Sequence, residues 1–427
     1  MANNVAADVA GNMASKIKSV DVVISGGGLS GTLMALSLSK LTKADGSLLS
    51  IAIIEKSVHT NVIDKKTQPV FDDRVLALSH GSVAYLQKIE VWHSLKNDAC
   101  AITDIDISDR GHFGKARVSA NEHGVNALGY VIDMALIGKA LVKVLAQQKN
   151  IHWFSPDFIS NIDWATSDKD KALDNIKVKL ESGDEVNTRL LLACDGAQSS
   201  CRQLANIEVS HYDYQQCALI ANVSTEKNHS NKAFERFTEF GPIAMLPLKP
   251  SAGQQNRCSL VWTLSPEQAK KIQSLNDDEF KLALEETFGS WLGAITHLGK
   301  RDVYPLVLLQ AKQQRYHRMA LVGNASHTIH PIAGQGFNLG LRDVEVMTAL
   351  VNEALLTEKD IGSFGLLQRY EKHRVKDQGE VIELTDSLVT LFANDISPLI
   401  AGRNVALSAM NFFKPLKNIL VKKTMGY

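Results

Sequence analysis

The chain has 427 residues, which is more than one ordinary domain requires, so two or three domains are expected. Hydrophobic residues make up 45% of the sequence and charged residues 22%, and these values exclude a largely disordered or fibrous protein. The formal net charge of +0 argues against nucleic acid as the main partner, because phosphate binding requires clustered Lys and Arg.

The N-terminal residues and the cysteines indicate where the protein is located. Residues 1–19 contain no continuous apolar run, so they predict a flexible extension rather than a signal peptide. No stretch approaches the roughly 20 apolar residues that cross a bilayer. The five cysteines are odd in number and lack a CxxC pair, which is typical of free thiols in a reducing compartment. We therefore expect a cytoplasmic protein, with peripheral contact to the inner membrane left open.

The first elements in chain order are predicted to be a strand, a turn, a helix and a second strand. Residues 20–24 form an apolar, β-branched run, and the pattern Gly26-x-Gly28-x-x-Gly31 follows directly. Helix-spaced apolar residues come next, and a second apolar run over 49–54 ends at Glu55. This order predicts a βαβ unit that binds a dinucleotide.

Each glycine of this pattern has a physical role in the predicted site. Gly26 turns the chain, Gly28 lets the backbone approach a pyrophosphate, and Gly31 lets the helix pack on the strand. The N–H groups at the start of the helix favour a phosphate there. Glu55 stands where a carboxylate accepts hydrogen bonds from a ribose. The competing interpretation is a glycine-rich turn without a ligand.

A second glycine site and an insertion are predicted in the middle of the chain. A helix is expected over 133–145, and strands are expected over 176–180 and 190–194. The last strand runs into Asp195-Gly196, which is either an ordinary left-handed turn or a second contact with the cofactor. Strand-like runs separated by loops fill residues 209–304 and predict an inserted β-rich substrate domain.

The nucleotide fold resumes at the apolar run 319–323, which ends in Gly323-Asn324, and the chain after Leu339 is largely helical. The predicted domains are a flexible extension (1–19), a discontinuous dinucleotide-binding domain (20–208 and 305–390), a β-rich substrate domain (209–304) and a C-terminal helical region (391–427).

The order of the glycine sites carries a family resemblance. GxGxxG, then Asp-Gly, then G-N-A-x-H and P-x-x-G-Q-G together resemble the flavoprotein aromatic hydroxylases of the para-hydroxybenzoate hydroxylase type over nearly the whole chain. Further segments resemble the ubiquinone-biosynthesis hydroxylases of that group: 71–74 (FDDR), 108–111 (SDRG), 233–238 (AFERFT), 241–247 (GPIAMLP) and 330–340 (HPIAGQGFNLG). The resemblance implies an α/β fold in which a Rossmann-like FAD-binding domain of the glutathione reductase type carries an inserted β-rich substrate domain and a helical C-terminus.

The resemblance also implies roles for individual residues. Pro331 opens a helix whose first N–H groups face the pyrimidine end of the flavin, where reduced flavin carries negative charge. These groups belong to Gly334, Gln335 and Gly336. Arg74 lies near the flavin or its phosphates, or else forms a structural ion pair. Relatives usually have Asp where this chain has Asn324, whose amide can still hydrogen-bond to the cofactor.

No catalytic side chain can be read from the sequence, because the flavin itself performs the chemistry. His327 and His330 titrate near neutrality and could act as acid–base groups, but core or capping histidines are the preferred interpretation. No metal site is expected, since no HExxH pattern accompanies them. The apolar and Lys-rich tail over 411–427 predicts a docked helix in preference to contact with an anionic surface.

The implied activity is the hydroxylation of a phenol. NAD(P)H reduces the FAD, O2 reacts with the reduced flavin, and one oxygen atom enters the ring. The implied substrate is a polyprenyl-methoxyphenol intermediate of ubiquinone biosynthesis, and other proteins of that pathway are implied partners. The alternatives are a hydroxylase acting at another ring position, a reductase or halogenase of the same fold, and a prenyl-binding escort without catalysis.

Overall fold

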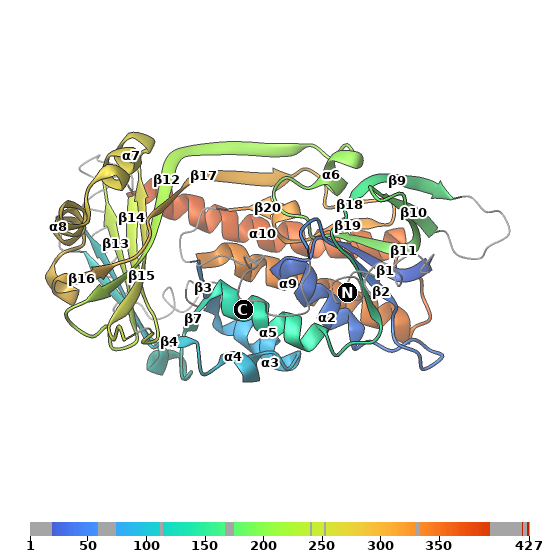
Figure 1. The fold of residues 1–427 in the computed structure, drawn as a ribbon, viewed down its shortest axis with the longest axis horizontal. Helices are drawn as coiled ribbons and strands as arrows, with labels where there is room; N and C mark the ends of the chain where they lie inside the picture. The colour runs from blue at the N-terminus through green and yellow to red at the C-terminus, as the bar shows by residue number, and fades with distance from the viewer. Residues whose placement is uncertain are drawn as a thin grey trace, which may run out of the picture.

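The computed structural model describes residues 19–58, 74–111, 114–166, 175–239, 241–251, 253–329, 334–392, 421 and 425–426. Within these ranges the chain forms three sheets with surrounding helices in an elongated arrangement (Figure 1). An eight-stranded sheet lies at one end and much of a nine-stranded sheet lies at the other. Two long helices, α9 (Gln335–Leu356) and α10 (Phe364–Phe392), run lengthwise between the two ends.

The eight-stranded sheet contains the predicted nucleotide-binding strands. Its members are β1 (Ser19–Ser25), β2 (Ile51–Ile54), β8 (Ile151–Phe154), β9 (Ile159–Thr166), β10 (Asn175–Leu180), β11 (Glu185–Ala193), β18 (Arg315–Tyr316) and β19 (Met319–Leu321). Strand β1 pairs in parallel with β11 on one side and β2 on the other, so that Val23 lies beside Leu191 and Ala52. Strand β19 extends the sheet by pairing in parallel with β11. The strands that precede all three glycine sites are therefore neighbours.

Helix α2 (Leu29–Ser39) packs on one face of this sheet, and the short helix α6 (Ser200–Leu204) packs on the other beside β9 and β10. Helices α3 (His80–Lys88), α4 (Trp92–Leu95) and α5 (Met134–Leu145) extend the core on the side of α2. Every residue of α2 from Gly31 to Ser39 is buried, because the helix packs against both α9 and α5 as well as the sheet. A helix without a polar face is stable only inside a core. Burial of large apolar side chains such as Leu33 contributes about 1.5–3 kcal/mol each.

The nine-stranded sheet forms most of the opposite end. It contains β5 (Asp104–Asp109), β6 (Lys115–Ser119), β12 (Val209–Thr225), β13 (Lys232–Thr238), β14 (Gly241–Pro247), β15 (Arg257–Leu264), β16 (Ile295–Leu298), β17 (Asp302–Ala311) and β20 (His327–Thr328). Helices α7 (Pro266–Ser274) and α8 (Asp277–Phe288), with the 3-10 turn η3 (Ser290–Leu292), pack on one face. We call this covered face the outer face and the opposite one the inner face.

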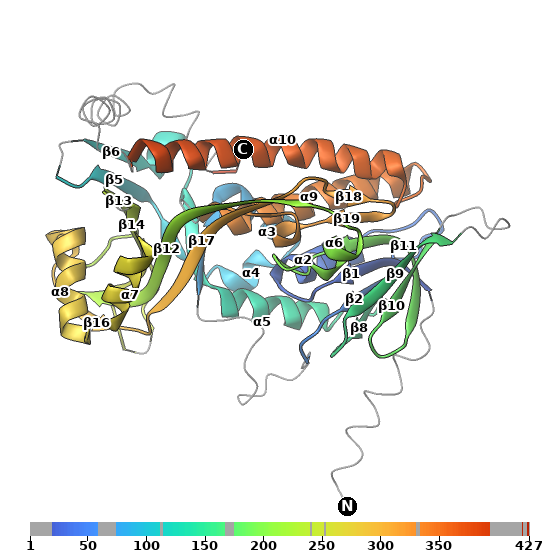
Figure 2. The same ribbon diagram turned by 90° about the horizontal axis from the view of Figure 1, so that it is seen from above.

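Two long strands join the ends of the molecule. Figure 2 shows β12 and β17 curving side by side from the nine-stranded sheet toward the nucleotide-binding end, and ten residue pairs match along them. Strand β5 comes from residues expected in the dinucleotide-binding domain, yet it pairs in parallel with β13 of the inserted segment. The domain boundaries stay a prediction, and the sheet around the insertion includes strands from outside 209–304.

A three-stranded sheet lies between these parts. It consists of β3 (Val75–Ser79), β4 (Cys100–Ile102) and β7 (Gly129–Asp133), and the 3-10 turn η2 (Ala120–His123) follows β6. The last described residues pack nearby, because the carbonyl of Met425 accepts a hydrogen bond from Gly81 N (2.8 Å) and Met425 is buried. The rest of the tail over 411–427, apart from Val421 and 425–426, lies outside the described residues. No helix in the described ranges is both long and apolar enough to cross a bilayer.

Candidate cofactor and active site

The first glycine site has the close packing that its spacing predicts. Gly26 adopts a positive φ of 97°, and a Cβ there would lie 2.5 Å from the carbonyl oxygen of Cys194. A Cβ at Gly31 would lie 1.9 Å from the carbonyl oxygen of Gly26, so only glycine lets α2 start this close to β1. Gly28 differs, because a Cβ there would meet no described atom within 4 Å. The loop is therefore tight where it packs on the sheet and open where a pyrophosphate would approach it.

Glu55 at the end of β2 reaches the same loop. Its Oε2 atom accepts a hydrogen bond from Gly27 N at 2.6 Å, and its Oε1 atom accepts one from Ser57 N at 2.8 Å. Each carboxylate oxygen has a second lone pair, so the side chain keeps capacity for a ribose hydroxyl. Glu55 thus fixes the loop, and the predicted contact with a ribose stays compatible with this arrangement.

The second glycine site lies directly beside the first. The amide of Cys194 donates to Ser25 O at 2.7 Å, which brings Asp195 next to Gly26. Oδ2 of Asp195 accepts hydrogen bonds from the start of α6, including one from Cys201 N at 3.1 Å. Its Oδ1 atom is buried and has no hydrogen-bond partner among the described residues. Gly196 adopts a positive φ of 82°, and a Cβ there would meet no described atom within 4 Å, so this edge is also open to a ligand.

The third glycine site packs against the first through α2. Gly323, in the 3-10 turn η4 (Gly323–Ala325), has a φ of 60°, and a Cβ there would lie 2.8 Å from Ser30 Oγ. A Cβ at Gly340 of α9 would lie 3.3 Å from Gly323 Cα. The side chain of Asn324 is exposed at the tip of the turn, where it can reach a ligand. Segments almost 300 residues apart in the sequence therefore meet at one edge of the sheet.

Helix α9 begins at the site with Gly334 in the left-handed conformation (φ 61°). A Cβ at Gly334 would lie 2.8 Å from the Cβ atom of Ala77, so this helix start lies against β3. Gln335 is buried at the first position of the helix, and a Cβ at the next residue, Gly336, would lie 3.9 Å from Cγ1 of Ile329. The predicted Pro331 and His330 lie outside the described residues. Two features of this helix start, its N–H groups and its dipole, suit the negative charge of a reduced flavin.

Asn338 anchors this helix start, although its role was not expected from the sequence. Its Oδ1 atom accepts hydrogen bonds from Ser79 N (2.9 Å) and Ser82 Oγ (2.7 Å). Its Nδ2 atom donates to the carbonyl oxygens of Ala77 and Gly334, both at 2.8 Å. All four hydrogen-bonding positions of the amide are used, so Asn338 holds α9, β3 and α3 in register.

Replacing Asn338 by alanine is expected to destabilise the protein, because the buried groups Ser79 N and Ser82 Oγ lose their partner. Each buried polar group left without a hydrogen bond costs about 1–3 kcal/mol. Urea denaturation measures the loss, and FAD titration of the variant measures whether the helix start is displaced. The exposed Asn161→Ala is the control, with an expected change of roughly 0.5 kcal/mol or less. Equal stability of the two variants would contradict the anchoring role.

A buried ionic network supports the third glycine site from behind. Asp343 of α9 is fully buried and its Oδ2 atom accepts hydrogen bonds from Gly323 N (2.8 Å) and from Nε2 of His327 (3.0 Å). Its Oδ1 atom accepts hydrogen bonds from Arg374 Nε (2.6 Å) and Gln378 Nε2 (3.2 Å) of α10. Burial acts to raise the pKa of Asp343, but the charges of His327 and Arg374 hold that pKa below its usual value. His327 is thus a core histidine, as the preferred interpretation expects.

Arg74 lies immediately before β3, at the boundary with the nine-stranded sheet. Its guanidinium carbon stands 5.4 Å from the ring centroid of Tyr304 in β17, which is a cation–π distance. The backbone carbonyl of Arg74 accepts a hydrogen bond from Met134 N at 2.8 Å. The side chain is exposed and projects between the two large parts of the molecule. Its predicted contact with the flavin or its phosphates stays a prediction.

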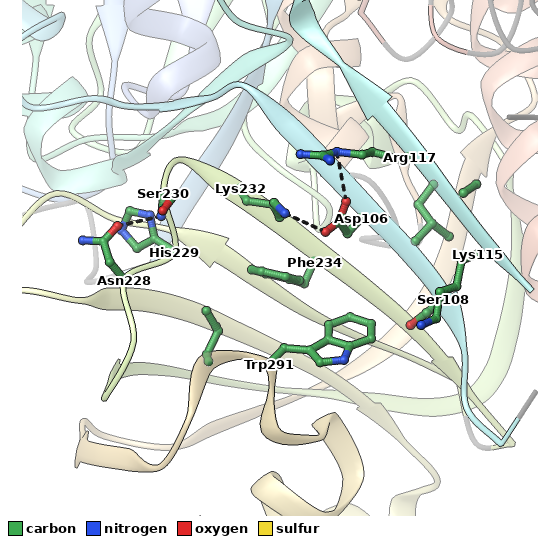
Figure 3. A pocket seen from close by; sticks show the side chains of 13 residues that line it. Asp106, Ser108, Lys115, Arg117, Asn228, His229, Ser230, Lys232, Phe234 and Trp291 are labelled. Atoms are coloured by element: carbon green, nitrogen blue, oxygen red, sulfur yellow. Dashed lines mark hydrogen bonds and ion pairs between the residues drawn. The ribbon is translucent and has the colours of Figure 1, made fainter. Parts of the chain in front are cut away.

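A cavity on the nine-stranded sheet lies away from these residues. Figure 3 shows it, with a volume of about 510 Å³, between β5, β6, β13 and η3. Phe234 and Trp291 form its apolar wall, and Lys232 and Asp106 form an ion pair of 2.9 Å at its rim. None of the predicted cofactor residues lines it, because it opens on the outer face of the nine-stranded sheet.

Comparison with known proteins agrees with this geometry. The family described as "FAD binding domain" matches residues 19–384. Ubiquinone hydroxylase UbiL of Rhodospirillum rubrum is 32% identical over 96% of this chain and 90% of its own length. The 3-demethoxyubiquinol 3-hydroxylase of Escherichia coli is 29% identical over 95% of this chain and 98% of its own length. Among solved structures, p-nitrophenol 4-monooxygenase PnpA of Pseudomonas putida has a TM-score of 0.74 and 17% identity, with 96% of this chain and 99% of that chain covered.

The fold and the converging glycine sites define a flavin-dependent aromatic monooxygenase that binds FAD. The chain belongs to the FAD-binding domain family and, within it, to the ubiquinone-biosynthesis hydroxylases. The residues fit FAD, since Gly28 and Gly196 leave open space and a buried oxygen of Asp195 has no partner in the described part of the chain.

Asn338 and Asp343 were missed by sequence reasoning. Both lie within or just after the 330–340 segment whose resemblance was recognised, so the segment pointed to the region but not to the residues. A polar residue on an otherwise apolar, buried helix face is the signal that could have identified them. The partners of these two polar residues come from α3, η4 and α10, and no local sequence pattern predicts those contacts.

Proposed function

We propose that this protein hydroxylates the ring of a polyprenyl-methoxyphenol in ubiquinone biosynthesis, in the reaction of a 2-octaprenyl-6-methoxyphenol hydroxylase. The observation that carries the proposal is the convergence of the three glycine sites and the start of α9 at one edge of the eight-stranded sheet. Names of the relatives from Rhodospirillum rubrum and Escherichia coli support the ubiquinone pathway. NAD(P)H is the proposed electron donor and O2 the second substrate.

FAD, when bound, takes two electrons from the nicotinamide and passes them to O2, so that one oxygen atom enters the ring and the other leaves as water. The residues of the chain supply binding and orientation. Gly26, Gly28 and Asp195 would hold the pyrophosphate and ribityl side of FAD, and the N–H groups at Gly334 and beyond would stabilise negative charge on the flavin. The mostly apolar inner face of the nine-stranded sheet excludes water from the ring.

A quinone-deficient host tests the proposal. A deletion strain that lacks the hydroxylase for this step accumulates the polyprenyl-methoxyphenol, and expression of this protein is expected to restore ubiquinone and remove the intermediate. Mass spectrometry of the lipid extract measures both compounds. Restored growth in a strain blocked at a different ring position would instead assign that position. An expressed, yellow protein that leaves every such intermediate unchanged would contradict a role in ring hydroxylation.

A further inference from the structure

The two faces of strand β13 have different surroundings. Phe234 packs on the outer face, where its ring centroid lies 5.8 Å from that of Phe288 in α8. Arg236 also turns to this side and donates from Nη1 to Phe288 O at 2.9 Å. Figure 3 shows Lys232 and Phe234 pointing into the outer cavity. Because side chains alternate along a strand, Glu235 lies on the inner face.

A row of partly exposed side chains crosses the inner face at this position. Glu235 pairs with Ile107 of β5 and with Ala244 of β14, and the row continues through Val261 of β15 to Ile220 of β12. We call these five residues the inner row. All five are partly exposed, whereas the outer-face residues Leu219, Ile243 and Leu260 are buried in the cluster formed with α7 and α8. Glu235 is the only polar side chain of the inner row.

The inner row faces the part of the molecule that holds the flavin site. Ala233, two residues before Glu235, packs in one apolar cluster with Val131 of β7 and Val75 of β3. Strand β3 ends at Ser79, whose amide is bound by Asn338 at the start of α9. A chain of direct contacts therefore joins the face that carries Glu235 to the helix start that faces the flavin.

The Glu235 side chain is enclosed by protein but keeps part of its surface exposed, as expected for a residue that lines an internal space. Among the residues that the structure describes, its carboxylate makes no hydrogen bond and no ion pair. A carboxylate in such a place is costly unless a ligand or a proton compensates it. Burial raises the pKa of Glu235 to about 7.

We propose that Glu235 is a catalytic residue that accepts the hydroxyl proton of the phenol substrate while the apolar residues of the inner row hold the ring. This role rests on the proposed function. The phenol O–H bond breaks and a carboxyl O–H bond forms, which raises the electron density of the ring. An electron pair of the ring then forms the new C–O bond with the oxygen derived from O2, and the hydrogen on that carbon leaves as a proton. The reduced nicotinamide supplies the two electrons, and the second oxygen atom leaves as water.

Other charged and titratable groups on the inner face lie further along the sheet. Asp109 of β5 lies two residues beyond Ile107, and β17 contributes Asp302, which pairs with Lys300 at 2.7 Å, and Tyr304. Arg74 reaches this face over Tyr304. Strands β14 and β15 contribute only apolar and hydroxyl side chains beside Glu235. Because the carboxylate form accepts the proton, hydroxylation is expected to rise with pH through about 7.

The test compares Glu235→Gln, Glu235→Asp and the control Glu239→Gln, which changes an exposed carboxylate after the same strand. The probe is 2-geranyl-6-methoxyphenol, with its methyl ether as a ligand that has no proton to donate. Glu235→Gln is expected to bind FAD and the probe normally, and to hydroxylate about 100-fold more slowly. It should lose the rise in rate through pH 7 and release more H2O2 per nicotinamide oxidised. Glu235→Asp should recover part of the rate, and affinity for the methyl ether should be equal in all variants.

Two failures can be told apart. If the wild-type protein hydroxylates the phenol and the Glu235→Gln variant has the same kcat and pH profile, the role of Glu235 is overturned and the proposed function stands. A FAD-loaded wild-type protein that forms no hydroxylated product overturns the proposed function together with this role. A slow Glu235→Gln variant that keeps the wild-type pH profile also contradicts the inference, because a structural defect lowers the rate without removing a titration.

Discussion

Replacing Gly28 by leucine is expected to give a folded protein that does not retain FAD. A Cβ at this position would meet no described atom within 4 Å, so the new side chain does not disturb the packing of the loop. It enters the space that the pyrophosphate needs, because this glycine lets the backbone approach the phosphates. Flavin absorbance per protein after gel filtration measures retention, and circular dichroism with thermal unfolding checks the fold.

Two other glycines separate loss of cofactor from loss of fold. Gly31→Leu is expected to prevent folding, since even a Cβ there would lie 1.9 Å from the carbonyl oxygen of Gly26. Gly365→Leu, at an exposed position near the start of α10 with no described atom within 4 Å, should keep both fold and FAD. A Gly28→Leu protein that stayed as yellow as Gly365→Leu would show that the pyrophosphate binds elsewhere.

Replacing Asp343 by alanine is expected to lower the free energy of unfolding by about 3 kcal/mol, because removal of one partner of a buried ion pair is strongly destabilising. The guanidinium of Arg374, a residue that is only 2% exposed, would lose Asp343 and keep its ion pair with Asp377 at 2.7 Å. Gly323 N also loses its acceptor, so the third glycine site should loosen and FAD should bind more weakly. Urea denaturation of the holoprotein and the apoprotein measures both effects.

The pH dependence of stability gives a second readout for Asp343. Its pKa is lower in the folded protein than its usual value, so its stabilisation is present above a pH of about 4 and declines as the pH falls through the folded pKa. Asp343→Asn should remove this part of the acid dependence. Glu353→Gln is the control, because Glu353 and its partner Arg369 are both exposed, and solvent weakens an exposed ion pair. Similar losses in the two variants would contradict the special role of the buried network.

The nucleotide-binding unit was predictable because its signals are local. Residues 20–24 form a short apolar run, and Gly26, Gly28 and Gly31 follow at fixed spacing. The structure confirms β1, α2 and β2 at these places. The strands before Asp195 and Gly323 were equally visible as short apolar runs. Strand β5 was not, because residues 104–109 carry Asp at 104, 106 and 109 and pair with β13 more than 120 residues later.

The sequence by itself determined the elements of the glycine sites and, through their order, the class of enzyme. Turns and helix starts are set by the conformations that a few adjacent residues allow, so spacing alone reveals them. The tertiary structure decided which side chains lie on the inner face of the nine-stranded sheet and which groups compensate a buried charge. Asn338, Asp343 and Glu235 are ordinary polar residues in the sequence, and their roles depend on partners and open space that distant strands and helices provide.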